Sequence, residues 1–376
     1  MKSFIFLLIG LSPLAAQWQT DLEEALALDI EDGRPDHFSL VEAAFVLSGA
    51  NQPDSLDQYV AWYDDLLNTL QSYNLDRHDR IASASKVFSY LHANWLLTYK
   101  EEATTLLNVV NEKRFNCVAG TILYNLVCQD LGWPTEAFET PSHTYTIFPD
   151  FGYDLTVENT SPIGFNIMRN LRDYSRYLMQ FYPQNEALKI GLDRIYHYEN
   201  SKGRPINNVE LLGLLAYNRA YFANRDQNYQ QAYEFVRLAQ KFNRDSRSNV
   251  NFEIGLYYRW GKQLVEQREY ETAFRLFADA YQRYWENNDF QNNCKYAFQL
   301  AQQQNWQDKA WPAFRALTDE MLSLDILTDR EIDSLKAYMF NWIQFFRQTK
   351  SPQETQNVAG YWRGIFPDDE FLKSLK

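Results

Sequence analysis

Cysteine and histidine are both scarce in this sequence of 376 residues, which contains three cysteines and five histidines. The cysteines, Cys117, Cys128 and Cys294, are too few for a disulfide framework, and their odd number leaves at least one thiol free. No two histidines have the spacing of a zinc-binding pair. We therefore expect a protein that uses neither a metal ion nor another cofactor and has at least one thiol available for chemistry.

Basic residues are also in deficit, with 36 Lys and Arg against 49 Asp and Glu, for a formal net charge of −13. Proteins bind nucleic acids and anionic membrane surfaces mainly through clustered Lys and Arg. The charge balance therefore argues against both classes of partner.

Long apolar runs are missing. The run Phe4–Leu11 is too short to cross a bilayer, but it follows Lys2 and precedes Leu14–Ala16, which ends in two alanines. This pattern is typical of a signal peptide over residues 1–16, and a buried N-terminal helix is the alternative. We expect a periplasmic or secreted protein with no membrane insertion.

The rest of the composition is typical of a folded protein, with 45% hydrophobic and 16% aromatic residues and only 14 Gly and 12 Pro. The length fits about two domains. Residues 200–205, which include Gly203 and Pro205, form the best candidate for a linker. We therefore place one domain at residues 17–200 and a second at residues 205–376.

Four helices are predicted before residue 100. In the two longer ones, apolar residues recur at intervals of three and four, as on one face of a helix. The predicted helices cover residues 21–28, 40–48, 56–73 and 81–99. They are expected to form a cap or scaffold ahead of the first cysteine.

The second half of the chain contains an internal repeat. Aromatic residues and alanines recur 41 positions apart, because 270 minus 229 and 273 minus 232 both give 41. The two sets are Tyr229, Ala232, Tyr233 and Ala239, then Tyr270, Ala273, Phe274 and Ala280. Repeats of this length are typical of stacked helix pairs. A third, weaker unit is expected from Trp306 through Ala310 to Phe314, and a plain helical bundle is the alternative.

The second of these units, with Tyr257, Trp260 and Gly261 ahead of it, resembles the tetratricopeptide repeat. The resemblance implies antiparallel helix pairs that bind a protein or peptide partner. Because tetratricopeptide repeats are about 34 residues long, one helix or connection here should be longer.

A candidate nucleophile lies at Cys117. Asn116 is a good N-cap, and the apolar residues after it predict a helix that closes at Gly132. At the first turn of a helix, free backbone N–H groups and the helix dipole favour a thiolate over a thiol. Lys113 and Arg114 add positive charge just upstream.

A histidine and a carboxylate follow on a predicted β-hairpin. The stretches on either side of Asp150 and Phe151 are rich in β-forming residues. If the turn is centred on these two residues, His143 lies directly across from Glu158, on the same face of the sheet. Asp154 shares this face but lies roughly 13 Å from the histidine. We therefore prefer Glu158 over Asp154, and a loop with an odd number of residues would weaken that choice.

The order of these elements resembles the transglutaminase-like superfamily, which has a papain-like cysteine-enzyme core. A helix starts at Asn116–Cys117, a strand with His143 follows, and the next strand ends at Glu158. The likeness covers about residues 85–170. It implies an α+β core in which a helix packs on a small antiparallel sheet, with Cys117 as nucleophile and His143 as general base. Glu158 stands where the family usually has Asp, and Tyr145 stands where it often has Trp.

We expect the remaining candidate side chains to have structural or surface roles. The backbone N–H of Cys117 is a natural oxyanion donor, and Asn111 is a possible second donor that we interpret as a solvent-facing residue. We interpret His78 and His92 as surface or structural residues. Cys128 and Cys294 are interpreted as small, inert hydrophobes.

The sequence thus favours an α+β transglutaminase-like domain followed by an all-α tetratricopeptide-like solenoid. The expected function is an exported cysteine enzyme that hydrolyses an amide bond or transfers its acyl group through a Cys117 thioester, while the repeats bind a protein or peptide. The alternative is a non-catalytic interaction scaffold with a degenerate enzyme domain. The substrate, the choice between hydrolysis and transfer, and the oligomeric state stay open.

Overall fold

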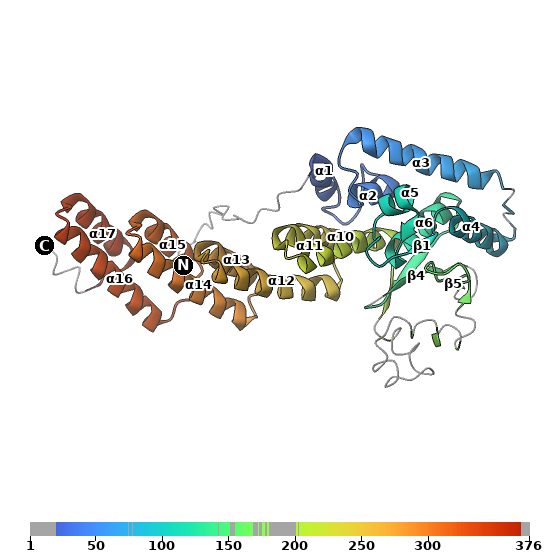
Figure 1. Cartoon of the computed structure of the whole chain (residues 1–376). Helices are drawn as coiled ribbons and strands as arrows, with labels where there is room; N and C mark the ends of the chain where they lie inside the picture. Colours follow the sequence, from blue (N-terminus) through green and yellow to red (C-terminus); the bar gives the residue numbers. More distant parts are fainter. Residues whose placement is uncertain are drawn as a thin grey trace, which may run out of the picture. The chain divides into compact units, whose positions relative to one another are not determined.

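The fold is described from a computed structural model of the chain, which is mostly helical with a small β-sheet (Figure 1). It describes residues 20–73, 75–76, 78–141, 143–150, 155–167, 172, 175–176, 179, 201 and 203–369. These residues divide into two compact units, one running to Leu256 and the other starting at Tyr257. The predicted signal peptide lies outside the described residues.

Five helices of the first unit precede or flank the candidate cysteine. They are α1 (Asp21–Asp29), α2 (Leu40–Leu47), α3 (Pro53–Gln71), α4 (Arg80–Asn94) and α5 (Leu106–Glu112). Side-chain caps fix several of their starts; the Ser39 hydroxyl, for example, accepts from Glu42 N–H in a capping box. The helix predicted over residues 81–99 ends earlier, because the chain leaves the helix at Trp95 and enters the short strand β1 (Thr98–Tyr99).

Helix α6 (Cys117–Asp130) is central to the first unit. All but three of its residues are buried, and it packs against α4, α10 and strand β4. Its end matches the sequence prediction: Gly132 adopts a left-handed φ of +84° and donates its N–H to Gln129 O. A central helix of this kind fixes its first residue, Cys117, firmly in the fold.

The sheet beside α6 is antiparallel and runs in the order β5-β4-β3-β6. Its strands are β5 (Leu155–Val157), β4 (Thr144–Phe148), β3 (Glu136–Glu139) and β6 (Arg204–Ile206). A separate parallel pair joins β1 to β2 (Arg114–Phe115), just before the cysteine. The coarse expectation of a helix beside a small antiparallel sheet is therefore confirmed.

Part of the predicted linker at residues 200–205 is a strand of the sheet. Arg204–Ile206 forms β6, which pairs with β3 at one edge of the sheet, where Pro205 is tolerated because an edge strand has an unpaired side. Helices α10 (Asn208–Arg225) and α11 (Tyr229–Phe242) then belong to the first unit, since α10 packs on α2 and α6. The predicted boundary at 200–205 thus falls inside this unit.

The internal repeat extends to the end of the described chain. After α10 and α11 come α12 (Arg247–Glu266), α13 (Tyr270–Arg283), α14 (Asn288–Gln307), α15 (Trp311–Ser323), α16 (Asp329–Gln348) and α17 (Pro352–Ile365). The second helix of each pair begins at residue 229, 270, 311 or 352, and successive starts are 41 residues apart. The first helices of the last three pairs are each 20 residues long, which accounts for a repeat longer than the tetratricopeptide unit.

The turn within each pair repeats as well. A non-glycine residue with positive φ ends the first helix of every pair, again at intervals of 41 residues: Gln227, Arg268, Lys309 and Lys350. The predicted repeat residues Ala232, Ala239, Ala273 and Ala280 are all buried. Within the described residues, no helix is both long and apolar enough to cross a membrane.

Candidate active site

Cys117 is the first residue of α6 and is half-buried. Asn116 caps the helix by accepting from Ala119 N–H at 3.1 Å, and its own amide donates to Glu101 O at 3.0 Å. The segment before the cysteine is fixed by the β1–β2 pairing, in which Tyr99 lies opposite Phe115. The Asn116 cap and the β1–β2 pairing therefore fix the helix N-terminus at which the thiol lies.

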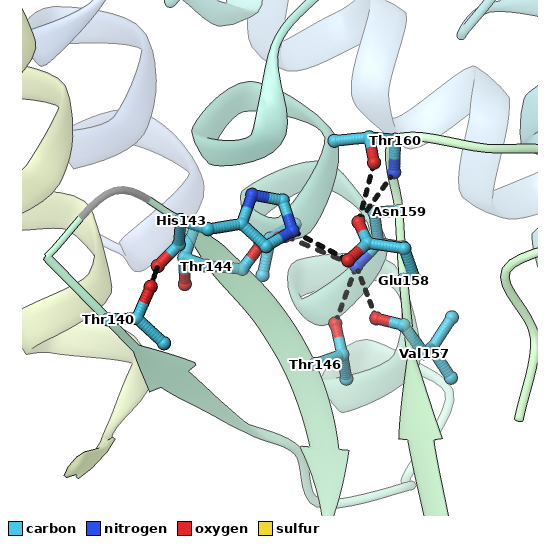
Figure 2. A network of polar contacts seen from close by, with 9 residues as sticks. Thr140, His143, Thr144, Thr146, Val157, Glu158, Asn159 and Thr160 are labelled. Atoms are coloured by element: carbon cyan, nitrogen blue, oxygen red, sulfur yellow. Dashed lines mark hydrogen bonds and ion pairs between the residues drawn. The ribbon is translucent and has the colours of Figure 1, made fainter. Parts of the chain in front are cut away.

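His143 and Glu158 form a closely paired, buried couple next to this helix (Figure 2). His143 Nε2 lies 2.6 Å from Glu158 Oε2. The other carboxylate oxygen, Oε1, accepts from the Thr160 hydroxyl at 2.6 Å and from Thr160 N–H at 3.1 Å. Because Nε2 is engaged by Glu158, the second ring nitrogen is the one left to face Cys117, which lines the same cavity and contributes to the raised pKa of His143. The three residues predicted from the sequence are thus brought together.

The predicted hairpin register is wrong by two residues. Thr146 pairs with Val157 and Phe148 with Leu155, so opposing residue numbers sum to 303 instead of 301. Glu158 is therefore a diagonal neighbour of His143 instead of its direct partner. An even shift leaves every side chain on its predicted face of the sheet, which is why the contact survives. The competing Asp154 lies outside the described residues.

Electrostatics favour an imidazolium and a carboxylate in this pair. Burial alone lowers the pKa of His143, but the charge of Glu158 and the hydrogen bonds to Cys117 and Glu158 outweigh it and hold that pKa well above its ordinary value. Burial alone raises the pKa of Glu158, but the charge of His143 and the hydrogen bonds from His143 and Thr160 lower it overall. A positively charged His143 therefore lies on the same cavity as Cys117.

A cavity of about 100 Å³ opens beside the thiol and the imidazole. Its wall includes Glu139 at the end of β3 and, from α10, Leu214, Tyr217 and Asn218. Sequence reasoning missed the α10 residues, because they lie about a hundred positions after Cys117 and carry no motif. The first helix of the repeat region thus forms one side of the cleft over the candidate nucleophile.

A buried chain of hydrogen bonds leads from the residue next to Glu158 toward α10, and Figure 2 shows its first link. Asn159, next to Glu158, donates to Thr146 Oγ1 at 2.8 Å, and Thr146 donates to Asn125 Oδ1 at 2.5 Å. Asn125 in turn donates to Asn208 Oδ1 at 2.8 Å, at the start of α10. The site is therefore tied to the repeat region through side chains that are all buried.

Gly164 holds the loop after Glu158 in place. Glu158 N–H donates to Gly164 O at 3.0 Å, and a Cβ added at Gly164 would lie 1.9 Å from Glu158 O. Only a glycine fits here without displacing the backbone of the candidate catalytic residue. The sequence offers no signal for this role beyond the glycine itself.

Tyr99 is a further residue of the site that the sequence did not single out. It lies on β1 near the thiol, with its ring 5.9 Å from that of Phe115. Burial raises the pKa of its hydroxyl, and negative charge at Cys117 and Glu158 acts in the same direction. The phenol therefore remains protonated and able to donate a hydrogen bond at neutral pH.

The remaining candidate side chains have positions that fit the structural or surface roles predicted for them. Asn111 is exposed on α5 and donates to the Tyr59 hydroxyl at 3.0 Å, while His78 is exposed. His92 is buried against Phe88, with 4.4 Å between the ring centroids, and burial lowers its pKa to about 4. Burial also raises the thiol pKa of both remaining cysteines, Cys128 and Cys294. Among the described residues, no group of three or more His, Cys, Asp or Glu side chains is arranged to hold a metal ion.

Comparison with known proteins adds little to this geometry. No protein-family model matches the sequence, and no curated protein matches it. Among solved structures, the chain is similar to a crystal structure of menin that reveals the binding site for the Mixed Lineage Leukemia protein. That similarity has a TM-score of 0.31 and 12% sequence identity, and it covers 74% of this chain and 69% of menin.

Proposed function

We propose that this protein is a transglutaminase-like cysteine enzyme that cleaves an amide bond through a Cys117 thioester. The supporting observation is the buried pair of His143 and Glu158, with 2.6 Å between Nε2 and Oε2, together with Cys117 on the same cavity as the histidine. A nucleophile, a base and an orienting acid in hydrogen-bonding order are what covalent acyl transfer requires.

In the proposed reaction, the Cys117 thiolate attacks the carbonyl carbon of the amide. Backbone N–H groups at the start of α6 would stabilise the negative charge that develops on the carbonyl oxygen. Protonated His143 gives its proton to the departing amine, which leaves a thioester on Cys117. Neutral His143 then takes a proton from water or from an acceptor amine, whose attack releases the acyl group and restores the thiolate.

The helical pairs after α11 are proposed to bind a protein or peptide partner. We also propose that the protein is exported, because residues 1–16 have the pattern of a signal peptide.

A trapping experiment tests this proposal. The full chain is incubated with a tryptic digest of casein, quenched with acid and analysed by intact mass spectrometry. We expect an acyl adduct on the native chain, its discharge by hydroxylamine, and no adduct on Cys117→Ala. If neither the native chain nor the variant gains mass on incubation and both leave the digest unchanged, the enzymatic proposal fails.

A second candidate function is a non-catalytic scaffold. The observation that favours it is the small volume beside the thiol, about 100 Å³, which accommodates little more than one side chain of a substrate. This candidate predicts the negative outcome of the trapping experiment together with partner binding that is unchanged in Cys117→Ala.

A further inference from the structure

The phenol of Tyr217 borders the same cavity as the candidate nucleophile Cys117. Tyr217 lies on α10, and its side chain is half-buried against the core of the first unit. The Phe252 ring of α12 packs against it, with 5.5 Å between the ring centroids. Packing therefore fixes the aromatic ring, while the hydroxyl has no hydrogen-bond partner among the residues that the structure describes.

The other hydroxyl and amide side chains of this cavity are less suited to donate a hydrogen bond to a substrate. The Thr140 hydroxyl donates to a backbone oxygen at 3.1 Å, and the Asn218 amide donates to Thr104 Oγ1 at 2.7 Å. Thr144 is only 1% exposed, so its hydroxyl is covered. Ser248 is exposed, and a hydrogen bond there competes with water. The phenol on α10 is the donor that remains.

The phenol is also in the right protonation state. Burial raises the pKa of Tyr217 above its ordinary value, and the charge of Glu139 acts in the same direction. The hydroxyl therefore stays protonated at neutral pH and can donate a hydrogen bond. A donor that packing holds in place stabilises charge on a reacting oxygen without having to reorganise during the reaction.

A further donor has a use in this site because the helix start supplies only part of what an oxyanion requires. At the first turn of α6, Asn116 already accepts from Ala119 N–H through its side chain and from Gly120 N–H through its backbone oxygen. The cavity is also small, about 100 Å³. An acyl group that Cys117 attacks would largely fill it and would contact the α10 wall.

We propose that Tyr217 is a catalytic hydrogen-bond donor, whose hydroxyl donates to the carbonyl oxygen of the acyl group that Cys117 attacks. It would stabilise the negative charge on that oxygen together with backbone N–H groups at the start of α6. A helix of the repeat region would thereby take a direct part in the reaction. The assignment rests on the proposed function in one respect, that Cys117 is the nucleophile.

Two reagents separate this role from a role in shaping the site. p-Nitrophenyl acetate acetylates a thiolate: a bond forms between Sγ and the carbonyl carbon, negative charge passes through the carbonyl oxygen, and p-nitrophenolate leaves with the electron pair of the broken C–O bond. Iodoacetamide alkylates the same thiolate by displacing iodide, and no charge develops on an oxygen. Both reactions need an accessible thiolate, but only acetylation gains from an oxyanion donor.

The test compares two variants of the full chain. Tyr217→Phe removes only the hydroxyl and keeps the ring against Phe252. The matched control is Tyr221→Phe, the same change one turn along α10 at a phenol that is 45% exposed and outside the cavity lining. The rates of acetylation and alkylation at Cys117 are measured at neutral pH by peptide mass spectrometry, and both variants should keep the native melting temperature.

We expect Tyr217→Phe to slow the acetylation of Cys117 by about tenfold or more, because removing one oxyanion donor can lower a rate by about 10²–10³. Alkylation in this variant, and both rates in Tyr221→Phe, should stay within about twofold of the native values. Native acetylation in Tyr217→Phe, an equal fall of both rates, or no acetylation of Cys117 in the native chain overturns the proposal.

Two further results have a defined meaning. A selective loss of acetylation in Thr144→Val but not in Tyr217→Phe would place the donor on β4, which also overturns the proposal. The trapping experiment with the casein digest tests amide cleavage separately. An absent amide adduct together with the selective loss in Tyr217→Phe would refute amide cleavage and support Tyr217 as the donor.

Discussion

Replacing Glu158 by glutamine should lower the reactivity of Cys117 at mildly acidic pH. Glutamine keeps the size of the side chain and a hydrogen-bond acceptor for His143, but it removes the charge that holds the imidazolium. A hydrogen bond to a charged group contributes about 1.5–3 kcal/mol. Since about 1.4 kcal/mol corresponds to a factor of ten, we expect the imidazolium form of His143 to become roughly 10- to 150-fold less populated.

The pH window of this effect follows from the signs of the two pKa shifts. The pKa of His143 is raised, so its charge persists above the ordinary value of 6.5 and is lost as the pH rises through the folded pKa. The pKa of Glu158 is lowered, so its charge persists below the ordinary value of 4.5 and is lost as the pH falls through the folded pKa. Between pH 4.5 and 6.5 both groups are charged in the native chain. The stabilising contribution of the pair is therefore fully present in this window.

The assay is the rate of iodoacetamide alkylation at Cys117 from pH 5 to 8, followed by peptide mass spectrometry. Glu136→Gln serves as the matched control, because it makes the same chemical change on β3 at a residue outside the cavity lining. We expect the control to follow the native profile and Glu158→Gln to fall at least tenfold below it at pH 6. Equal rates for the native chain and Glu158→Gln at pH 6 would refute the assignment of Glu158.

Four further substitutions test the surroundings of the site and the repeat. In Gly164→Ala the new Cβ would lie 1.9 Å from a backbone oxygen. This substitution should destabilise the chain by about 1–3 kcal/mol and slow the alkylation of Cys117. Alkylation at the native rate would contradict the proposed positioning role of Gly164. Gly261→Ala would place a Cβ 2.1 Å from a phenylalanine ring and should lower the melting temperature. Gly360→Ala, whose Cβ would have nothing within 4 Å, should raise the melting temperature slightly. Two shifts of the same sign would contradict this packing. Asn208→Ala leaves its buried partners unpaired, so urea unfolding should show a loss of about 1–3 kcal/mol, and alkylation of Cys117 should slow if the hydrogen-bond chain positions the site.

The three candidate catalytic residues could be predicted because their signals are local. An N-cap followed by an apolar run defines the start of α6 at Cys117, and strand alternation decides which face His143 and Glu158 share. The register could not be predicted, because it depends on the loop between β4 and β5, where turn residues fix no single length. The even error preserved the shared face, and an odd one would have moved Glu158 to the other side of the sheet.

Other features depend on contacts between residues that are distant in the sequence. Leu214 and Tyr217 reach the cleft only because α10 packs on α6, and no periodicity in α10 shows that contact. The last repeat was missed for a different reason: its second helix begins with Pro352 where the earlier ones begin with aromatic residues. Its length and turn geometry repeat nonetheless, and those are visible only in the backbone.

The most direct test of the central claim is the relative alkylation rate of the three cysteines in the native chain at pH 6. Burial raises the pKa of Cys294 to about 12 and also raises that of Cys128, so both should react very slowly in the folded protein. We predict that Cys117 reacts at least a hundredfold faster than either, and that His143→Ala removes most of this difference. If Cys117 instead reacts no faster than a free cysteine in a peptide, or reacts equally fast without His143, the proposed catalytic triad is contradicted.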